Sequence, residues 1–329
     1  MGLAMNDILR VNLLSPIPLA FVLGVIARVI RSEFALPKEI YQGLSIYLLW
    51  SLGLHGGAEL ARATLSEISK PAAVTLLIGC ITPVSAYATL RYIGRFGEAD
   101  SAGIAAHYGS VSAVTFIAAS TFVKGMGAEP EGFMPTLLTL LESPGIHIAL
   151  AIGALRTARK SRPASELLHE VFTGRTMVLL VGGLLVGVLI GDSNWKTIEP
   201  FYDTKGAVFR GALCIFMLEM GVLAGSRLAD LKQVGPFLIA FGMLIPLVHG
   251  ALGAWLGSVA GLSIGGATML GAMAASASYI AAPPAVRMTL PDANPTYYLA
   301  LALAITFPFN VLVGIPLYFA VARMAHGSA

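Results

Sequence analysis

The sequence predicts an all-α polytopic membrane protein: about ten transmembrane helices in a 5+5 inverted repeat, with helices 4 and 9 discontinuous. Hydrophobic residues make up 56% of the 329 residues, and charged residues make up only 12%. A soluble domain carries about a quarter charged residues, so this chain cannot cover a globule with a solvated surface. Its apolar runs are continuous rather than alternating, which disfavours a porin-like β-barrel.

Apolar runs of span length follow one another along the chain, and a membrane helix needs about 20 such residues. In order they cover residues 13–30, 40–58, 71–91, 101–123, 133–155, 175–191, 206–225, 234–257, 265–287 and 297–322. A hydrophilic connection follows the fifth run. We therefore expect a first five-helix repeat over residues 1–160, a cytoplasmic connecting loop over 161–174 and a second five-helix repeat over 175–329.

Landmarks of the first half recur in the second half in the same order, at an offset that drifts from 168 to 164 residues. The matched pairs are Gly53–Gly57 with Gly221–Gly225, Ser110 and Ser112 with Ser276 and Ser278, Pro130 with Pro295, and Glu142–Pro144 with Thr306–Pro308. Such a series indicates an internal repeat. An odd number of spans in each half makes the second copy enter from the opposite face, so the repeat is inverted.

The Lys and Arg residues predict the orientation. Thirteen of the twenty-one lie in the loops after the odd-numbered spans, and cytoplasmic loops carry the excess of positive charge. We therefore expect a multi-pass membrane protein with both termini outside. The net charge of +3 is too small to suggest a nucleic-acid partner.

Two serine pairs stand inside apolar runs, in Gly109-Ser110-Val111-Ser112-Ala113 and Ala275-Ser276-Ala277-Ser278-Tyr279. Small residues that allow close helix packing, with each hydroxyl bonded to its own helix, are one explanation. The other is that each helix breaks there, so that the N-termini of two half-helices and the hydroxyls meet at one small anion. The second explanation predicts substrate-binding residues Gly109, Ser110, Ser112, Ala275, Ser276 and Ser278.

A carboxylate and several neutral oxygens predict a cation site beside these pairs. Glu142 lies inside an apolar run, and its repeat equivalent is Thr306, with Asn310 one turn further on. An intramembrane carboxylate is a functional-site hypothesis by default. Pro144 and Pro308 leave carbonyls unbonded one turn earlier. We therefore expect sodium at Thr115, Glu142, Thr306 and Asn310, between spans 4 and 5 and between spans 9 and 10.

Other polar residues leave their roles open. Glu219 is a second intramembrane acid, which a neighbouring span or a subunit partner would explain as well as a functional role. His55, His147 and His249 are explained by packing, and His107, next to the first serine pair, lies close enough to line a pocket. Cys80 and Cys214 are expected to be buried free thiols. We expect no transition metal, no cofactor and no enzyme activity, because no Cys/His metal spacing, Walker loop or nucleophile elbow is present.

The second half of the chain resembles that of the SbtA-type sodium-dependent bicarbonate transporters. The resemblance rests on Ser276–Pro283, Leu290–Pro295, Thr306–Asn310 and Gly314–Pro316, with looser agreement at Gly109–Ser112 and Glu142–Pro144, and it covers about residues 13–323. It implies two inverted sets of five helices, core and gate subdomains drawn from both repeats, and an elevator-like movement. It also implies a homotrimer that takes up bicarbonate with sodium, and a PII-like regulatory protein at the cytoplasmic face.

The residues thus predict a sodium-coupled symporter of a small oxyanion without a cofactor, and the resemblance implies that the anion is bicarbonate. Alternatives are a sodium- or proton-coupled transporter of another small monocarboxylate or oxyanion on the same fold, and an anion channel.

Overall fold

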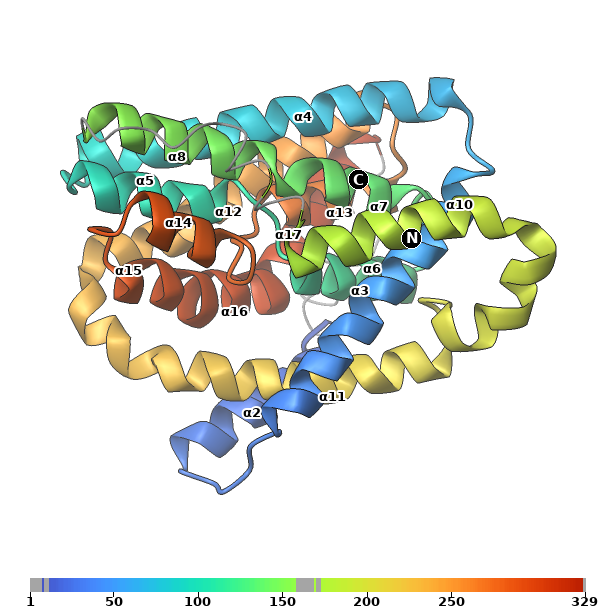
Figure 1. Ribbon diagram of the computed structural model, residues 1–329, viewed down its shortest axis with the longest axis horizontal. Helices are drawn as coiled ribbons and strands as arrows, with labels where there is room; N and C mark the ends of the chain where they lie inside the picture. Colours follow the sequence, from blue (N-terminus) through green and yellow to red (C-terminus); the bar gives the residue numbers. More distant parts are fainter. Residues whose placement is uncertain (1–7, 9–11, 158–168, 170–172, 328–329) are drawn as a thin grey trace.

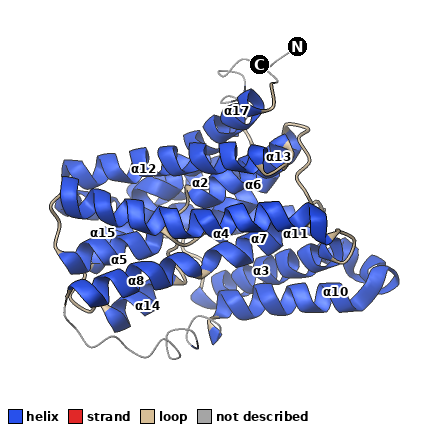
Figure 2. Ribbon diagram, turned by 90° about the horizontal axis from the view of Figure 1, so that it is seen from above, coloured by secondary structure: helices blue, strands red, loops and turns tan. Residues whose placement is uncertain are grey.

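The computed structural model describes residues 8, 12–157, 169 and 173–327, and these form helices and connecting loops without a strand (Figures 1 and 2). The all-α prediction is confirmed for this part of the chain. The predicted connecting loop over 161–174 lies outside the described residues, apart from 169, 173 and 174.

The helices follow the order of the predicted runs. Those of the first half are α2 (Pro16–Val29), α3 (Lys38–Leu60), α4 (Leu65–Ala88) with the π-helical η1 (Thr89–Ile93), α5 (Glu98–Tyr108), α6 (Ala113–Gly125), α7 (Met134–Glu142) and α8 (Pro144–Arg156). Those of the second half are α10 (Arg175–Tyr202), α11 (Ala207–Arg227), η2 (Leu228–Asp230), α12 (Leu231–Val259), α13 (Ile264–Ala274), α14 (Ala282–Thr289), α15 (Pro295–Ala300), η3 (Leu301–Thr306), α16 (Phe307–Phe309), η4 (Asn310–Gly314) and α17 (Ile315–Ala325).

Among the described residues, 5 helical segments are long and apolar enough to cross a membrane. They are Leu65–Ile93, Glu98–Gly125, Met134–Arg156, Asn194–Val259 and Pro295–Ala325, and shorter apolar helices cover Pro16–Val29, Arg175–Gly191 and Ile264–Ala274. The chain therefore has the helices of a membrane-embedded protein. The arrangement of ten spans in a 5+5 inverted repeat stays a prediction.

Helices α2, α3, α10 and α11 pack in pairs through glycines. Helix α3 runs along α10, and α2 runs along α11 (Figures 1 and 2). The backbones come very close, because a Cβ on Gly57 would lie 2.2 Å from the carbonyl oxygen of Leu184, and one on Gly221 would lie 2.0 Å from that of Phe21. Small residues at such crossings let membrane helices gain dispersion contacts where no hydrophobic driving force exists. We call these four helices the paired-helix group.

Helices α4, α5, α8, α12, α13 and α17 pack against one another in a second group. The predicted interruptions lie within it. Run 101–123 divides into α5 and α6 with a break at 109–112, and run 265–287 divides into α13 and α14 with a break at 275–281. We call these two breaks the first and second crossover.

The last run of each half is not a simple continuous α-helix. Ser143 separates α7 from α8, whereas the run 297–322 continues through π-helical turns on both sides of Pro308. Proline has no N–H to donate to the carbonyl one turn earlier, and π-helical turns commonly accompany such a defect. Both cysteines are free as expected, but Cys80 is exposed and Cys214 is half-buried. The expectation of two buried thiols is therefore wrong for Cys80 and met only in part for Cys214.

Candidate functional site

The two crossovers are hydrogen-bonded to each other. The main-chain N–H of Ser112 donates to Oγ of Ser276 at 2.9 Å, and the main-chain N–H of Ser278 donates to the carbonyl oxygen of His107 at 2.8 Å. These bonds occupy backbone groups that the helix breaks would otherwise leave unpaired in an apolar interior. The structure therefore brings the two serine pairs together, although they are more than 160 residues apart in the chain.

One serine of each pair caps the half-helix that follows. Oγ of Ser112 accepts from the N–H of Thr115 at 3.2 Å, at the start of α6. Oγ of Ser278 accepts from the N–H groups of Ala281 and Ala282 at 3.2 and 3.3 Å, at the start of α14. A hydroxyl that accepts in this way keeps its own proton free to donate. The Ser278 hydroxyl can therefore donate to an anion, and the Ser112 hydroxyl can do so in place of its long contact of 3.5 Å with the hydroxyl of Tyr279.

The expectation that both half-helices offer free N–H groups is wrong for α14. Its first turn contains Pro283 and Pro284, which have no N–H, and Ser278 already takes the N–H of Ala282. At α6, by contrast, Ala113 and Val114 lie in the first turn and line the cavity described below. The positive end of α6 therefore supplies the main-chain donors on its own.

The other predicted substrate residues lie behind the cavity and hold the crossovers in place. Oγ of Ser110 donates to the carbonyl oxygen of Glu142 at 2.9 Å, and Oγ of Ser276 donates to that of Met273 at 2.8 Å. The carbonyl oxygen of Ala275 accepts from Nδ2 of Asn310 at 2.9 Å. Gly109 touches Gly145 so closely that a Cβ on Gly109 would lie 3.0 Å from its backbone.

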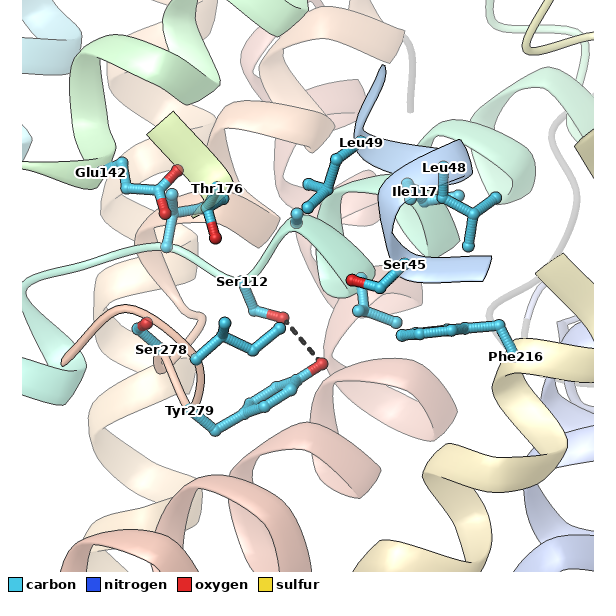
Figure 3. Close-up of a pocket in the computed structure, with 14 residues that line it drawn as sticks. Ser45, Leu48, Leu49, Ser112, Ile117, Glu142, Thr176, Phe216, Ser278 and Tyr279 are labelled. Atoms are coloured by element: carbon cyan, nitrogen blue, oxygen red, sulfur yellow. Dashed lines mark hydrogen bonds between the residues drawn. The ribbon is translucent and has the colours of Figure 1, made fainter. Parts of the chain in front are cut away.

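A small cavity lies where the crossovers face the paired-helix group (Figure 3). Its volume is about 30 Å³, room for roughly two or three water-sized groups. Its walls are formed by Ser45, Leu48, Leu49, Val111, Ser112, Ala113, Val114, Ile117, Glu142, Thr176, Phe216, Ser278, Tyr279 and Ile280. Such a volume favours an anion of few heavy atoms.

Glu142 reaches the cavity without a hydrogen-bond partner. It is 3% exposed, and its Oε2 is buried with no partner among the described residues. Burying an ionised carboxylate without a partner costs much free energy, because the group loses its hydration. Glu142 therefore needs a bound cation or a proton. Glu142 and Thr176 also line a second cavity of about 370 Å³, which is bounded by Arg175 and Pro284. Glu142 therefore borders both the small cavity and the larger one.

The remaining predicted cation ligands have protein partners. Oγ1 of Thr306 donates to the carbonyl oxygen of Gly242 at 2.8 Å and lies 2.6 Å from the hydroxyl of Tyr108. Oδ1 of Asn310 accepts from the hydroxyl of Tyr318 at 2.8 Å. Thr115 is buried beside the first crossover. Of the four predicted ligands, Glu142 lines the small cavity, and Asn310 bonds to the second crossover. Thr306 instead bonds to Tyr108, which directly precedes the first crossover.

Residues whose roles the sequence left open have structural partners. Oε2 of Glu219 accepts from the N–H of Leu36 at 3.1 Å, which agrees with a pair to a neighbouring segment. His249 shares a hydrogen bond of 2.7 Å with Ser85, and the ring of His107 stacks on Tyr298. The part of the chain that the structure describes has no cluster of three or more His, Cys, Asp or Glu residues able to hold a metal ion.

The sequence did not single out Ser45, Thr176, Tyr279 and Phe216 as site residues. Ser112 donates to the hydroxyl of Tyr279 across 3.5 Å, and the other three come from helices α3, α10 and α11. Tyr279 follows the second serine pair directly, which could have indicated it. Nothing in the spacing of the other three relates them to the crossovers.

Comparison with known proteins gives a family match over nearly the whole chain. A family model described as the Na⁺-dependent bicarbonate transporter superfamily matches residues 16–323. No curated protein matches the chain.

Proposed function

Because the chain belongs to the Na⁺-dependent bicarbonate transporter superfamily, we propose that it is a secondary active symporter that carries bicarbonate into the cell with sodium. The observation that carries this proposal is the buried Glu142 carboxylate, which has no partner among the described residues and lines one cavity with Ser112 and Ser278. A carboxylate and two hydroxyls in one small cavity suit a cation and an anion bound together.

Sodium would act on the anion through charge. An ionised Glu142 repels an anion in a cavity of low dielectric, where Coulomb energies are large. A sodium ion at this carboxylate cancels the negative charge, and the anion then finds the hydroxyls of Ser112 and Ser278 and the positive end of α6. Each ion therefore improves binding of the other, which is the coupling that symport needs.

Further features of the proposal rest on the resemblance and on the repeat. Two inverted five-helix repeats would contribute to both a core and a gate subdomain, and the core would move as an elevator. We expect the gate to be the paired-helix group, because its glycine contacts make a rigid scaffold. We also expect a homotrimer in the bacterial inner membrane, both termini outside, and a PII-like regulator at the cytoplasmic face.

Uptake by purified protein in proteoliposomes tests the proposal. An inward sodium gradient should drive accumulation of radiolabelled bicarbonate above the level in protein-free liposomes. Replacing external sodium by potassium at constant membrane potential should abolish the accumulation. Equal uptake in both salts would overturn the sodium coupling, and flux that never saturates with bicarbonate would indicate an anion channel instead.

A second candidate is transport of another small monocarboxylate, and the cavity wall favours it. Acetate has the same number of heavy atoms as bicarbonate, with a methyl group in place of the hydroxyl. Leu48, Leu49 and Phe216 give the cavity an apolar wall that suits a methyl group. Sodium-driven uptake of acetate that bicarbonate does not inhibit would favour this candidate.

A further inference from the structure

Two hydroxyls from the paired-helix group line the cavity, Ser45 on α3 and Thr176 on α10. Each residue is 8% exposed. Figure 3 shows the Ser45 oxygen turned towards Ser112 and Tyr279, and the Thr176 oxygen on the side of the cavity where Glu142 lies. The hydroxyls of the crossovers and those of the paired-helix group therefore border one small space.

The helices themselves do not use these two hydroxyls. A Ser or Thr inside a helix commonly donates to the carbonyl four residues earlier. Ser51 donates in this way to Tyr47 at 2.7 Å, and Thr75 to Pro71 at 2.8 Å. Ser45 and Thr176, by contrast, have no hydrogen bond to any residue that the structure describes. Both hydroxyls open into the small cavity, so their partner is whatever occupies it. A ligand that displaces water from this cavity must replace the hydrogen bonds that the water made, because an unpaired hydroxyl costs free energy.

The two hydroxyls can distinguish small anions by the substituent that each anion carries beside its carboxylate group. Bicarbonate and acetate share a carboxylate group, which the crossover hydroxyls and the start of α6 can bind in either anion. They differ in the third substituent, a hydroxyl in bicarbonate and a methyl in acetate. A site built to pair with a substrate hydroxyl rejects the analogue that lacks it, because its own polar groups are then left unpaired.

We propose that Ser45 and Thr176 are the specificity-determining residues of this transporter, which pair with the third oxygen of bicarbonate and thereby select it over acetate. This inference rests on the proposed function. The other cavity residues that the paired-helix group supplies are Leu48, Leu49 and Phe216, and such an apolar surface suits a methyl group. The two hydroxyls thus favour bicarbonate, whereas the apolar residues beside them favour acetate.

The test measures acetate inhibition of sodium-driven bicarbonate uptake in proteoliposomes. The variants are Ser45→Ala and Thr176→Val, each of which removes a hydroxyl with little change of shape. In each, the ratio of the acetate inhibition constant to the bicarbonate KM should fall about tenfold, as expected for one lost hydrogen bond, while the sodium concentration for half-maximal uptake stays the same. Matched controls are Ser51→Ala on the same helix and Thr75→Val, whose hydroxyls are bonded within their own helices.

Thr176→Ser separates hydrogen bonding from packing. This variant keeps the hydroxyl and loses the methyl group, so it should keep the wild-type ratio, whereas a packing role would make it worse than Thr176→Val. An unchanged ratio in Ser45→Ala and Thr176→Val overturns the inference, and so does a change in sodium dependence at a constant ratio. Absence of sodium-driven bicarbonate uptake by the wild type would instead overturn the proposed function.

Discussion

The main-chain N–H of Ser112 donates to the side-chain oxygen of Ser276 at 2.9 Å, so the backbone of the first crossover is paired with a side chain of the second. The same oxygen donates its proton to the carbonyl of Met273 at 2.8 Å. In return, Ser278 of the second crossover donates its N–H to His107 at the end of α5. Neither crossover has its full set of hydrogen bonds without the other, which makes the pair one structural unit.

Ser276→Ala should therefore destabilise the protein and slow transport. The substitution leaves the N–H of Ser112 without an acceptor, and a buried unsatisfied donor costs about 1–3 kcal/mol. We expect a lower unfolding temperature in detergent and lower sodium-driven bicarbonate uptake per folded molecule. Ser258→Ala is the matched control, because the Ser258 hydroxyl bonds to Ala254 within its own helix. Equal stability of the two variants would show that the bond between the crossovers is not needed.

Glu142→Gln should weaken sodium binding and at the same time raise the stability of the folded protein. The amide keeps the shape of the side chain and removes the charge that holds the cation, while relieving the cost of a buried carboxylate. We expect a higher unfolding temperature than in the wild type at low sodium, and at least a tenfold loss of sodium-stimulated uptake, about 1.4 kcal/mol of lost stabilisation. Differential scanning fluorimetry in sodium and in potassium measures the first effect, because sodium should stabilise the wild type alone.

Thr139→Val on the same helix is the control, because the Thr139 hydroxyl bonds to Pro135. It should keep both the sodium response and the uptake. A Glu142→Gln variant with unchanged sodium stabilisation would remove Glu142 from the cation site.

Gly145→Ala should disrupt the junction between the first crossover and α8. A Cβ at this position would lie 1.8 Å from the carbonyl oxygen of Gly109, a distance that forces the backbones apart. Such overpacking costs about 1–3 kcal/mol or more, and the displaced Gly109 carries Ser110 and Ser112 with it. We expect poor yield of monodisperse protein on size-exclusion chromatography, and lost uptake in what remains. Gly43→Ala is the control, since no atom lies within 4 Å of the Cβ it would carry, and a similar loss there would contradict the steric explanation.

The sequence predicted the all-helical fold and the two breaks because each break has a local signal. A serine pair inside an apolar run is costly unless its surroundings satisfy it, and such a pair occurs once in each half of the sequence. The same reasoning predicted Glu142 as a buried acid, which the structure confirms at 3% exposure. Local sequence did not separate the serines that line the cavity from Ser110 and Ser276, which bond behind it.

The far wall of the cavity could not be predicted, because it depends on how distant helices pack. Ser45 and Thr176 are each one of several small polar residues in the sequence of their helices, which also contain Ser51 and Thr197, and such residues usually bond to their own helix. The start of α14 was predictable in principle. The absence of N–H groups in Pro283 and Pro284 can be read from the sequence. It was missed because the predicted repeat led to the same expectation for both half-helices.

An ion pair at the surface links the paired-helix group to the helices that pack on the second helix group. Nζ of Lys205, between α10 and α11, lies 3.0 Å from Oε2 of Glu129, between α6 and α7. Helices α6 and α7 pack on α13 and α4 of the second helix group. Nearby, Nζ of Lys124 at the end of α6 donates to Oγ1 of Thr204 at 3.1 Å. Lys205 and Glu129 are 50% and 59% exposed, so the pair itself contributes about 1 kcal/mol or less. The pair is useful because its two positions are neighbours that the proposed elevator movement would separate.

A reducible bifunctional thiol reagent across these positions should stop transport if the parts move. The variant carries Glu129→Cys and Lys205→Cys with Cys80→Ser and Cys214→Ser, and we expect at least a tenfold loss of uptake on cross-linking and recovery after reduction. The control pair is Arg227→Cys with Asp230→Cys, whose native side chains are 3.2 Å apart within one continuous stretch of chain. Cross-linking there joins residues that move together, so uptake should stay unchanged. Because the native ion pair is weak, the uncross-linked Glu129→Cys and Lys205→Cys variant should transport at nearly the wild-type rate, and full transport by its cross-linked form would contradict the elevator movement.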